Sequence, residues 1–583
     1  MAKKLDKVDA VVVGLSWSGG ITAAELTKKG YKVVGLERGK DQKVEDFIGS
    51  KDELKYQQRH EMMQDLSIES ITSRNDTDEE AEPIRSHDDF QAGNDLGGGG
   101  VHWSGASFRY QPYDFEIYSK TVERYGKEKI PEDMTIQDWG ITYNEFEKYY
   151  DKFEKTAGIS GEENPIGPER SDEYPNPPMV DTPNIKLFKD AAENLGYHPY
   201  QHPSANNTTN YENPDGQTIH QCQYCAFCTT YGCDFGAKGD PVVTVLPTAQ
   251  ETGNFEIRTK SMATRVLYDG EKATGVLYVD LDTGKKYEQP ADIVVLGAFT
   301  FSNTRLLLLS EIGEPYDPDT GEGVIGKNFT GHLGQNPRGY AFFDDKKFNL
   351  YMGAGALGAT FDDFSADNID HSDLDFLHGG EVETRQYGAV PIGYNHVPNG
   401  TPSWGKEFKE KSVFYHNRTV YTRFQMAVLP MKQHYMDLDP NYKDINGDPL
   451  LRMTYDFTDQ DKNLSQYGAK ILEEVLEEMG ADSIKIEEMA DKFPNVYSGG
   501  HYAGGVIMGK EPETSAVNNY LQMWDAENVF VVGASAFPHF GNYNPTETVG
   551  ALAYRASEGM IEYLEGDGGL LVDPVEEKEE SNS

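Results

Sequence analysis

The sequence predicts an α/β fold of two domains, in which segments from both ends of the chain build one unit. The chain has 583 residues, which is enough for two or more hydrophobic cores. Strand–turn–helix patterns near both ends of the chain indicate the shared α/β unit. Long connections rich in Pro, Asn and Asp lie between them and indicate that a second domain is inserted.

The composition excludes several classes of function. Hydrophobic residues make up 37% of the chain and aromatic residues 11%, as in a folded globular protein. The formal net charge of −44 disfavours nucleic acid, whose phosphates would be repelled, and adsorption to an anionic membrane. No apolar run is long enough to cross a membrane, and the N-terminus lacks an apolar signal core. We therefore expect a cytoplasmic location by default.

The α/β unit begins with a strand–helix–strand pattern. Residues 8–13 are an apolar, β-branched run that predicts a buried parallel strand. A glycine-rich turn follows at 14–20, and a helix is expected from about 19 to 29 because Gly30 suits its end. A second strand is expected at 32–36. This order is typical of domains that bind a dinucleotide.

The turn of this unit has the spacing G-x-S-x-x-G. Gly14 allows a tight turn, and Gly19 allows the helix to pack closely on the strand. The N-terminus of the helix then presents free N–H groups and positive potential to a pyrophosphate. Ser16 replaces the usual middle glycine and is small enough to admit a phosphate. Glu37, at the end of the second strand, can accept hydrogen bonds from a ribose diol.

Three further segments carry related patterns. Residues 93–105 contain four consecutive glycines at 97–100 and then His102; such a loop lets backbone amides approach a ligand closely. Residues 292–310 predict a buried strand, a Gly-Ala turn and an apolar helix. The region 501–549 contains a histidine segment, a short strand, a turn and the start of a helix.

Together these segments resemble the glucose–methanol–choline (GMC) oxidoreductase family over nearly the full length of the chain. Residues 99–103, 402–406 and 543–546 are most similar to its gluconate- and sugar-dehydrogenase branch, which is related to pyranose oxidase. The resemblance implies a Rossmann-like FAD-binding domain of the GMC type. It also implies an inserted α+β substrate-binding domain that contains a mostly antiparallel sheet.

Domain boundaries follow from the resemblance and the composition. The FAD-binding domain is expected at 1–115, 221–334 and 495–566, the substrate-binding domain at 116–220 and 335–494, and an acidic tail at 567–583.

The turn motif and the resemblance together assign the residues that bind FAD. They are Gly14, Ser16, Gly19, Gly20, Glu37, Arg38, Gly98, Gly99, Gly100, His102, Trp103, Val266, Gly533, Ala534, Asn544, Pro545 and Thr546. His102 lies where pyranose oxidase attaches its flavin covalently, and both a covalent link and a packing contact remain open. Pro545 suits the first turn of a helix whose N-terminus would face the flavin pyrimidine edge.

The catalytic residues are assigned in the same way. His501 and Asn544 match the pair that flanks the substrate hydroxyl in GMC enzymes, and His539 is a third candidate. Hydride leaves the carbinol carbon for flavin N5, while a neutral imidazole is suited to accept the hydroxyl proton. Asn544 can orient the substrate oxygen and stabilise its developing charge.

All four cysteines lie in one short segment: Cys222, Cys225, Cys228 and Cys233. Closely spaced thiolates suit an iron–sulfur cluster or a metal ion. Spacing within one loop favours ferredoxin-type ligation over a zinc ribbon, and structural zinc and disulfides are the alternatives. Sugar-dehydrogenase relatives carry a [3Fe–4S] cluster in a comparable loop, so the resemblance implies that cluster here.

The sequence and the resemblance therefore predict an FAD-dependent dehydrogenase that oxidises a hydroxyl of a sugar, sugar acid or polyol, with gluconate as the leading substrate. The resemblance implies a small partner subunit and a haem or quinone electron acceptor; through such a partner the chain could also be exported or attached to a membrane. The alternatives are an oxidase that produces peroxide, a lyase whose FAD stays oxidised, and an electron-transfer subunit without a substrate. The presence of both His501 and Asn544 disfavours the last of these.

Overall fold

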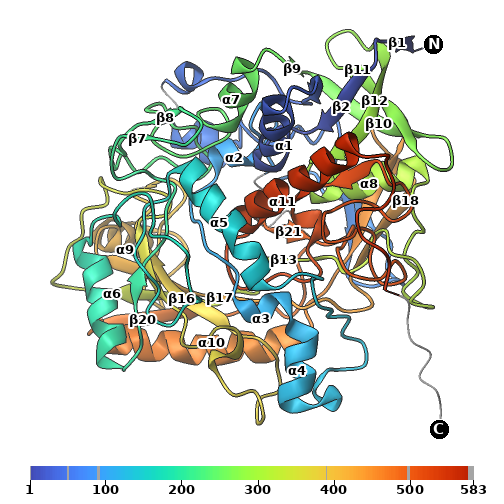
Figure 1. Cartoon of the computed structure of the whole chain (residues 1–583). Coiled ribbons are helices and arrows are strands. Elements are labelled where there is room, and N and C mark those ends of the chain that lie inside the picture. Colours follow the sequence, from blue (N-terminus) through green and yellow to red (C-terminus); the bar gives the residue numbers. More distant parts are fainter. Residues whose placement is uncertain (1, 49–50, 88–91, 389, 496–498, 576–583) are drawn as a thin grey trace.

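The computed structural model describes residues 2–48, 51–87, 92–388, 390–495 and 499–575. The end of the predicted acidic tail, 576–583, lies outside the described residues. Two large sheets lie apart in the molecule, with helices α5 and α11 between them (Figure 1). The α-helices are α1 (Trp17–Lys28), α2 (Gly99–His102), α3 (Pro112–Phe115), α4 (Ile117–Tyr125), α5 (Tyr143–Ala157), α6 (Pro183–Asn194), α7 (Val245–Glu251), α8 (Thr300–Ser310), α9 (Lys406–Tyr415), α10 (Asp459–Glu478) and α11 (Thr546–Glu565).

The first sheet has eight strands and collects segments from three distant parts of the chain. These strands are β1 (Lys3–Lys4), β2 (Val8–Val13), β3 (Val33–Leu36), β9 (Phe255–Arg258), β10 (Ser261–Tyr268), β11 (Ala273–Asp280), β12 (Lys286–Leu296) and β22 (Val529–Val531). Strands β9, β3, β2, β12 and β22 pair in parallel in that order, whereas β10, β11 and β12 form an antiparallel meander. β3, β22 and most of β2 are apolar and buried, as expected for strands covered on both faces, whereas β9 at the edge of the sheet is only partly buried.

The predicted strand–helix–strand unit is present as β2, α1 and β3. Helix α1 ends at Lys28, and Gly30 follows with φ = +95°, a conformation that glycine adopts without strain. A Cβ at Gly19 would lie 1.9 Å from the carbonyl oxygen of Gly14, so only glycine lets α1 approach β2 this closely. Gly20 faces α7, where a Cβ would lie 2.7 Å from Val245. Both glycines therefore serve the packing of α1.

The second sheet has six strands, and all of its pairings are antiparallel. In spatial order they are β20 (Ser483–Glu487), β14 (Arg338–Phe342), β17 (Thr419–Met426), β16 (Gly380–Arg385), β15 (Gly358–Phe361) and β6 (Tyr200–Gln201). Helices α6 and α10 pack against this sheet, and their apolar faces share a core with Phe361 and Phe424. The mixed α/β fold with an antiparallel second sheet is thus confirmed.

Three smaller sheets complete the structure. β18 (Tyr435–Lys443) and β19 (Pro449–Thr454) form a hairpin that continues into β4 (Ile71–Arg74) and β5 (Glu82–Pro83). β13 (Thr330–Gly331) pairs with β21 (Tyr502–Ala503), and β7 (Tyr211–Glu212) with β8 (Thr218–Ile219). The four-stranded sheet joins segments from both predicted domains, and the domain boundaries stay a prediction. Among the described helices, none is long and apolar enough to span a membrane.

Candidate active site

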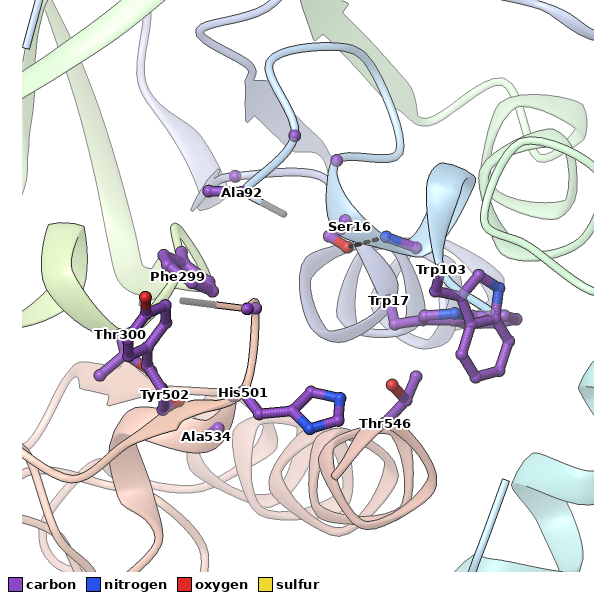
Figure 2. A pocket seen from close by; sticks show the side chains of 18 of the residues that line it. Ser16, Trp17, Ala92, Trp103, Phe299, Thr300, His501, Tyr502, Ala534 and Thr546 are labelled. Carbon is purple, nitrogen blue, oxygen red and sulfur yellow. Dashed lines mark hydrogen bonds between the residues drawn. The ribbon is translucent and has the colours of Figure 1, made fainter. Parts of the chain in front are cut away.

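A cavity of about 390 Å³ lies where the parallel strands of the first sheet end. Val13 at the end of β2, Gly297 after β12 and Val532 after β22 line it. Ligands of open α/β sheets bind at this carboxyl edge. Figure 2 shows Ser16 at one side of the cavity, and His501 near Thr546 at another.

Most residues predicted to bind a cofactor line this cavity. They are Gly14, Ser16, Glu37, Arg38, Gly98, Gly99, Gly100, Trp103, Gly533, Ala534, Asn544, Pro545 and Thr546. Gly19, Gly20, His102 and Val266 do not line it. His102 is 1% exposed, and neither ring nitrogen has a hydrogen-bond partner among the described residues. Strand β10 contributes Ser261, Met262, Ala263 and Thr264 instead of Val266.

The turn before α1 forms one end of the cavity. Gly14 has φ = +85°, and a Cβ there would lie 2.6 Å from the carbonyl oxygen of Gly297. The Ser16 hydroxyl accepts a hydrogen bond from the backbone N–H of Gly100 at 3.2 Å. Gly98 has φ = +50°, a conformation that L side chains rarely adopt, and a Cβ there would lie a tight 3.1 Å from the Cβ of Ser16. The glycine-rich loop therefore lies directly against the N-terminus of α1.

Glu37 is held at the end of β3 by backbone amides. Its carboxylate accepts hydrogen bonds from the N–H groups of Leu15 at 3.1 Å and Gly39 at 2.8 Å. Burial raises the pKa of the carboxyl group, although these hydrogen bonds act in the opposite direction. The side chain is 7% exposed and borders the cavity, so the carboxylate stands where the turn motif places a ribose.

His501 is positioned by the pairing of β13 with β21. Gly331 lies opposite Tyr502, so the flanking residues His332 and His501 become neighbours. The N–H of His332 donates to the carbonyl oxygen of His501 at 3.1 Å, and the two Nδ1 atoms are 3.0 Å apart. Phe540 packs on both imidazoles, with ring centroids 4.6 Å from His332 and 6.0 Å from His501.

The hydrogen bonds around His501 define its tautomer. A guanidinium group only donates, so Arg385 Nη2, at 3.0 Å, must face the oxygen of the Asn544 amide. The amide nitrogen of Asn544 then donates to Nε2 of His501 at 3.2 Å. Nε2 is therefore the unprotonated nitrogen, and Nδ1 carries the proton that is shared with His332.

His501 is kept in the neutral form. Burial, together with the positive charges of Arg423 and Arg385, lowers its pKa to about 3. Burial also lowers the pKa of His332 well below its ordinary value, and the neighbouring His501 acts in the same direction. Nε2 of His501 is thus unprotonated at neutral pH, and its electron pair accepts the hydrogen bond from Asn544 at the lining of the cavity.

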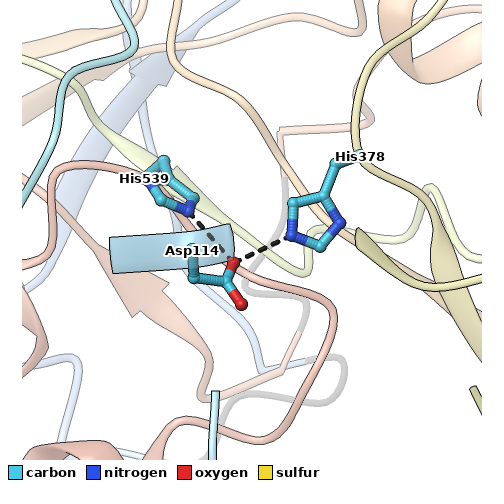
Figure 3. Close-up of side chains that lie close together, drawn as sticks. All are labelled: Asp114, His378 and His539. Carbon is cyan, nitrogen blue, oxygen red and sulfur yellow. Dashed lines mark hydrogen bonds and ion pairs between the residues drawn. The ribbon is translucent and has the colours of Figure 1, made fainter. Parts of the chain in front are cut away.

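His539 lies outside the lining of the cavity. Its Nε2 is 3.2 Å from Oδ1 of Asp114, the same oxygen that His378 Nε2 approaches at 2.8 Å (Figure 3). The indole N–H of Trp139 donates to Nδ1 of His539 at 3.3 Å. All three members of the Asp114 group are buried, so His539 fastens the loop before Phe540 to the protein interior rather than facing the cavity.

Of the four cysteines, only Cys228 lines the cavity. All four thiols are free. Two groups of three possible metal ligands with donor atoms within 4.8 Å of one another occur in the described parts of the chain, and neither contains a cysteine. In the described parts of the chain, the thiols are therefore not arranged around a single metal ion such as zinc.

Comparisons with known proteins decide the family. The GMC oxidoreductase C-terminal profile matches residues 430–553. The gluconate 2-dehydrogenase flavoprotein of Pantoea cypripedii is 41% identical over 595 aligned residues, which cover 98% of this chain and 96% of that protein. The chain belongs to the GMC oxidoreductases. It is therefore an FAD-dependent oxidoreductase that acts on CH–OH groups.

Other relatives of this GMC oxidoreductase differ in their reactions. The fructose dehydrogenase large subunit of Gluconobacter japonicus is 25% identical, with 97% of this chain and 99% of that protein covered. Two solved structures share the fold: formate oxidase of Aspergillus oryzae RIB40 (TM-score 0.60, 13% identity, 96% of this chain and 99% of that one) and pyridoxine 4-oxidase of Mesorbium loti (TM-score 0.57, 14% identity, 95% and 99%).

The cavity of this GMC oxidoreductase fits FAD. The glycines at 14 and 98 have positive φ and carry no side chains beside the N-terminus of α1, where a pyrophosphate would meet free N–H groups. The N-terminus of α11, at Pro545 and Thr546, lines the opposite end, where it would favour negative charge on the flavin. Glu37 would bind the ribose of the adenosine half.

Sequence reasoning missed three residues beside His501: His332, Arg385 and Arg423, which all line the cavity. None of them belongs to a recognised motif. Arg385 is on β16 and Arg423 is on β17, and the pairing of these strands brings the two together.

Proposed function

We propose that this protein is an FAD-dependent dehydrogenase that oxidises a hydroxyl group of a sugar, sugar acid or polyol. The observation that carries the proposal is the placement of His501 Nε2 and Asn544 Nδ2, 3.2 Å apart, at the cavity that fits the cofactor. Gluconate is the leading substrate, because the relative with 41% identity is named for it.

His501 acts as the base in this proposal. When bound, FAD supplies the acceptor for the hydride. Nε2 of His501 takes the hydroxyl proton, and His332 stabilises the resulting imidazolium because its Nδ1 already accepts the other N–H. Asn544 orients the hydroxyl, since its amide is held in one orientation by Arg385.

The rate of flavin reduction should be nearly constant from about pH 5 to pH 8. A histidine base acts in its neutral form, which is present above its pKa, and the pKa of His501 is lowered to about 3. Anaerobic stopped-flow measurements of the rate of flavin reduction against pH test this expectation. A loss of rate below pH 6.5, the ordinary pKa of histidine, would show that the base is not shielded in this way.

The proposal for the electron exit rests on sequence. Cys222, Cys225, Cys228 and Cys233 would hold a [3Fe–4S] cluster, which passes electrons singly to a haem or quinone acceptor. The loop contains positive φ angles at Tyr224 and Ala226, and backbone N–H groups donate to the sulfurs of Cys222 and Cys233, both at 3.4 Å. The thiolates that bind a multi-iron cluster lie further apart than those that bind one ion. The four sulfurs therefore need not lie as close together as they would around zinc.

A partner subunit belongs to the same proposal. One relative is named as the large subunit of fructose dehydrogenase, and a smaller partner would fit this chain as well. Association with a membrane, or export, would then depend on that partner.

An oxidase is the second candidate function. Two relatives from Streptomyces, 26% and 25% identical, are named 6'''-hydroxyparomomycin C oxidase and paromamine 6'-oxidase. Reoxidation of the substrate-reduced protein by air within one turnover time, with one peroxide formed per substrate, would favour the oxidase over the dehydrogenase.

The deciding experiment is an anaerobic absorbance titration of the purified protein with sugars, sugar acids and polyols. We expect gluconate to bleach the flavin bands, and broad visible absorbance with three irons per chain to remain underneath. A flavin that dithionite bleaches but no hydroxyl compound does would contradict the dehydrogenase and favour a lyase. If gluconate bleaches the flavin but the protein contains no iron, only the proposed cluster is contradicted.

A further inference from the structure

Two arginines meet around one buried carboxylate at the end of the cavity that contains His501. Glu383 lies directly opposite Arg423 in the β16–β17 pairing, and Arg385 is two residues further along the same face. The distance from Arg385 Nε to the Glu383 carboxylate is 2.7 Å, and that from Arg423 Nη2 is 2.5 Å. Both arginines line the cavity together with Asn544.

The charges in this group do not balance. Arg385 and Arg423, with burial opposing them, lower the pKa of Glu383 to about 2, so that it carries one negative charge. Burial and the charge of Glu383 raise the pKa of Glu381 well above its ordinary value, which keeps Glu381 neutral. Two positive charges therefore share one negative charge.

The other titratable groups nearby do not supply the missing charge. Burial and Arg385 lower the pKa of His202 to about 3, so the imidazole beside Glu383 is neutral. Asp362 accepts hydrogen bonds from Tyr200 at 2.7 Å and Asn164 at 2.5 Å, and among the described residues it forms no ion pair with either arginine. An uncompensated buried charge costs several kcal/mol, and an anionic ligand would remove that cost.

One donor of this pair is also unused. Nε of Arg423 is buried and has no hydrogen-bond partner among the described residues. Planar guanidinium groups bind carboxylates through two parallel hydrogen bonds. The lining of the cavity therefore combines a surplus positive charge with guanidinium groups, the kind of group that binds carboxylates, and one of these arginines has an unpaired donor.

We propose that Arg385 and Arg423 bind the carboxylate of the substrate, and that this pair makes the enzyme select hydroxy acids over neutral sugars and polyols. The proposal rests on the function proposed above. Arg385 contacts Asn544, which contacts His501, so a carboxylate held by the pair lies close to the base. The reacting hydroxyl is therefore on a carbon next to the carboxylate. Its C–H hydride passes to FAD and its O–H proton to His501, which leaves a 2-oxo acid.

The test compares gluconate with gluconamide, which has the same hydroxyl groups without the charge. We expect wild-type kcat/KM to be at least tenfold higher for gluconate, because a charge-assisted hydrogen bond contributes about 1.5–3 kcal/mol. Arg423→Gln should raise KM for gluconate about tenfold or more and leave KM for gluconamide within about twofold. Arg423→Lys keeps the charge and should recover part of the lost affinity for gluconate. It replaces the glutamine variant in the test if that variant fails to fold.

Arg452→Gln is the matched control. Arg452 pairs with Asp437 on the β18–β19 hairpin and does not line the cavity, so this variant should discriminate between the substrates as the wild type does. Equal wild-type efficiency with both substrates would overturn the proposal. An equal loss with both substrates in Arg423→Gln would overturn it as well.

Propionate separates a failure of this inference from a failure of the proposed function. It has a carboxylate and no hydroxyl, so its binding, measured by the change in the oxidised flavin spectrum, needs no turnover. We expect propionate to bind to wild type and to bind at least tenfold more weakly to Arg423→Gln. Equal binding to both proteins would refute the carboxylate site even if gluconate is oxidised. If propionate binds more weakly to Arg423→Gln than to wild type but no substrate bleaches the flavin, the carboxylate site is supported and the dehydrogenase function is contradicted.

Discussion

Replacing His501 with alanine is expected to slow flavin reduction by about 10²–10⁴-fold, the usual contribution of a positioned base. The substitution removes the imidazole nitrogen that contacts Asn544 and leaves the turn at 14–20 intact. FAD content should therefore remain one per chain. Rapid-mixing measurements under nitrogen, with saturating substrate, give the rate directly.

The control for this experiment is His198→Ala, because His198 is half-exposed on the surface and pairs with Asp363 far from the cavity lining. Its rate should equal that of the wild type. A His501→Ala protein that retains more than a tenth of the wild-type rate would contradict the assignment of His501 as the base. In that case His332 would be the next imidazole to replace.

The largest effect on stability is expected for Arg109→Met. Arg109 binds Glu154 through two hydrogen bonds, at 2.8 and 3.0 Å, and Glu147 through a third at 2.6 Å. Without Arg109, the buried carboxylate of Glu154 keeps Arg170 as its ion-pair partner and loses the other. Breaking such a pair typically lowers the free energy of unfolding by about 3–5 kcal/mol. Urea denaturation followed by flavin fluorescence measures the loss.

The pH dependence of this loss has a definite sign. Burial would raise the pKa of Glu154, but the two arginines prevail and lower it below the ordinary value of 4.5. A carboxyl group with a lowered pKa stabilises the fold above its unfolded pKa, and this contribution disappears as the pH falls. The gap between wild type and Arg109→Met should therefore shrink below pH 4.5. Arg124→Met, an exposed control, should change stability by less than about 0.5 kcal/mol at any pH.

Local sequence patterns were sufficient to predict the residues at the cofactor end of the cavity. The tight turn at Gly14 and the close helix packing at Gly19 require a residue without a Cβ. Because only glycine meets this requirement, both features could be predicted from the sequence. The apolar parallel strands could also be predicted from the sequence, because they are short runs of apolar residues. His501 and Asn544, 43 residues apart, were paired correctly in space because both follow recognisable segments.

The substrate end could not be predicted in this way. Arg385 and Arg423 meet because β16 and β17 pair in one particular register, and no local pattern encodes that register. His332 becomes the partner of His501 through a two-residue ladder that is too short to be recognised. His539 was misplaced because a histidine in a turn reads the same whether it faces a cavity or, as here, a buried aspartate.

The order of strands in the first sheet has a consequence for synthesis. β22 is made some 500 residues after β2, and both border the cavity that fits FAD. At about 5–20 residues per second, roughly half a minute to two minutes pass between the emergence of these two strands from the ribosome. Until β22 emerges, one edge of β12 lacks this neighbouring strand, so the nascent chain offers a binding site to chaperones. The cavity that fits FAD is complete only after β22 has emerged.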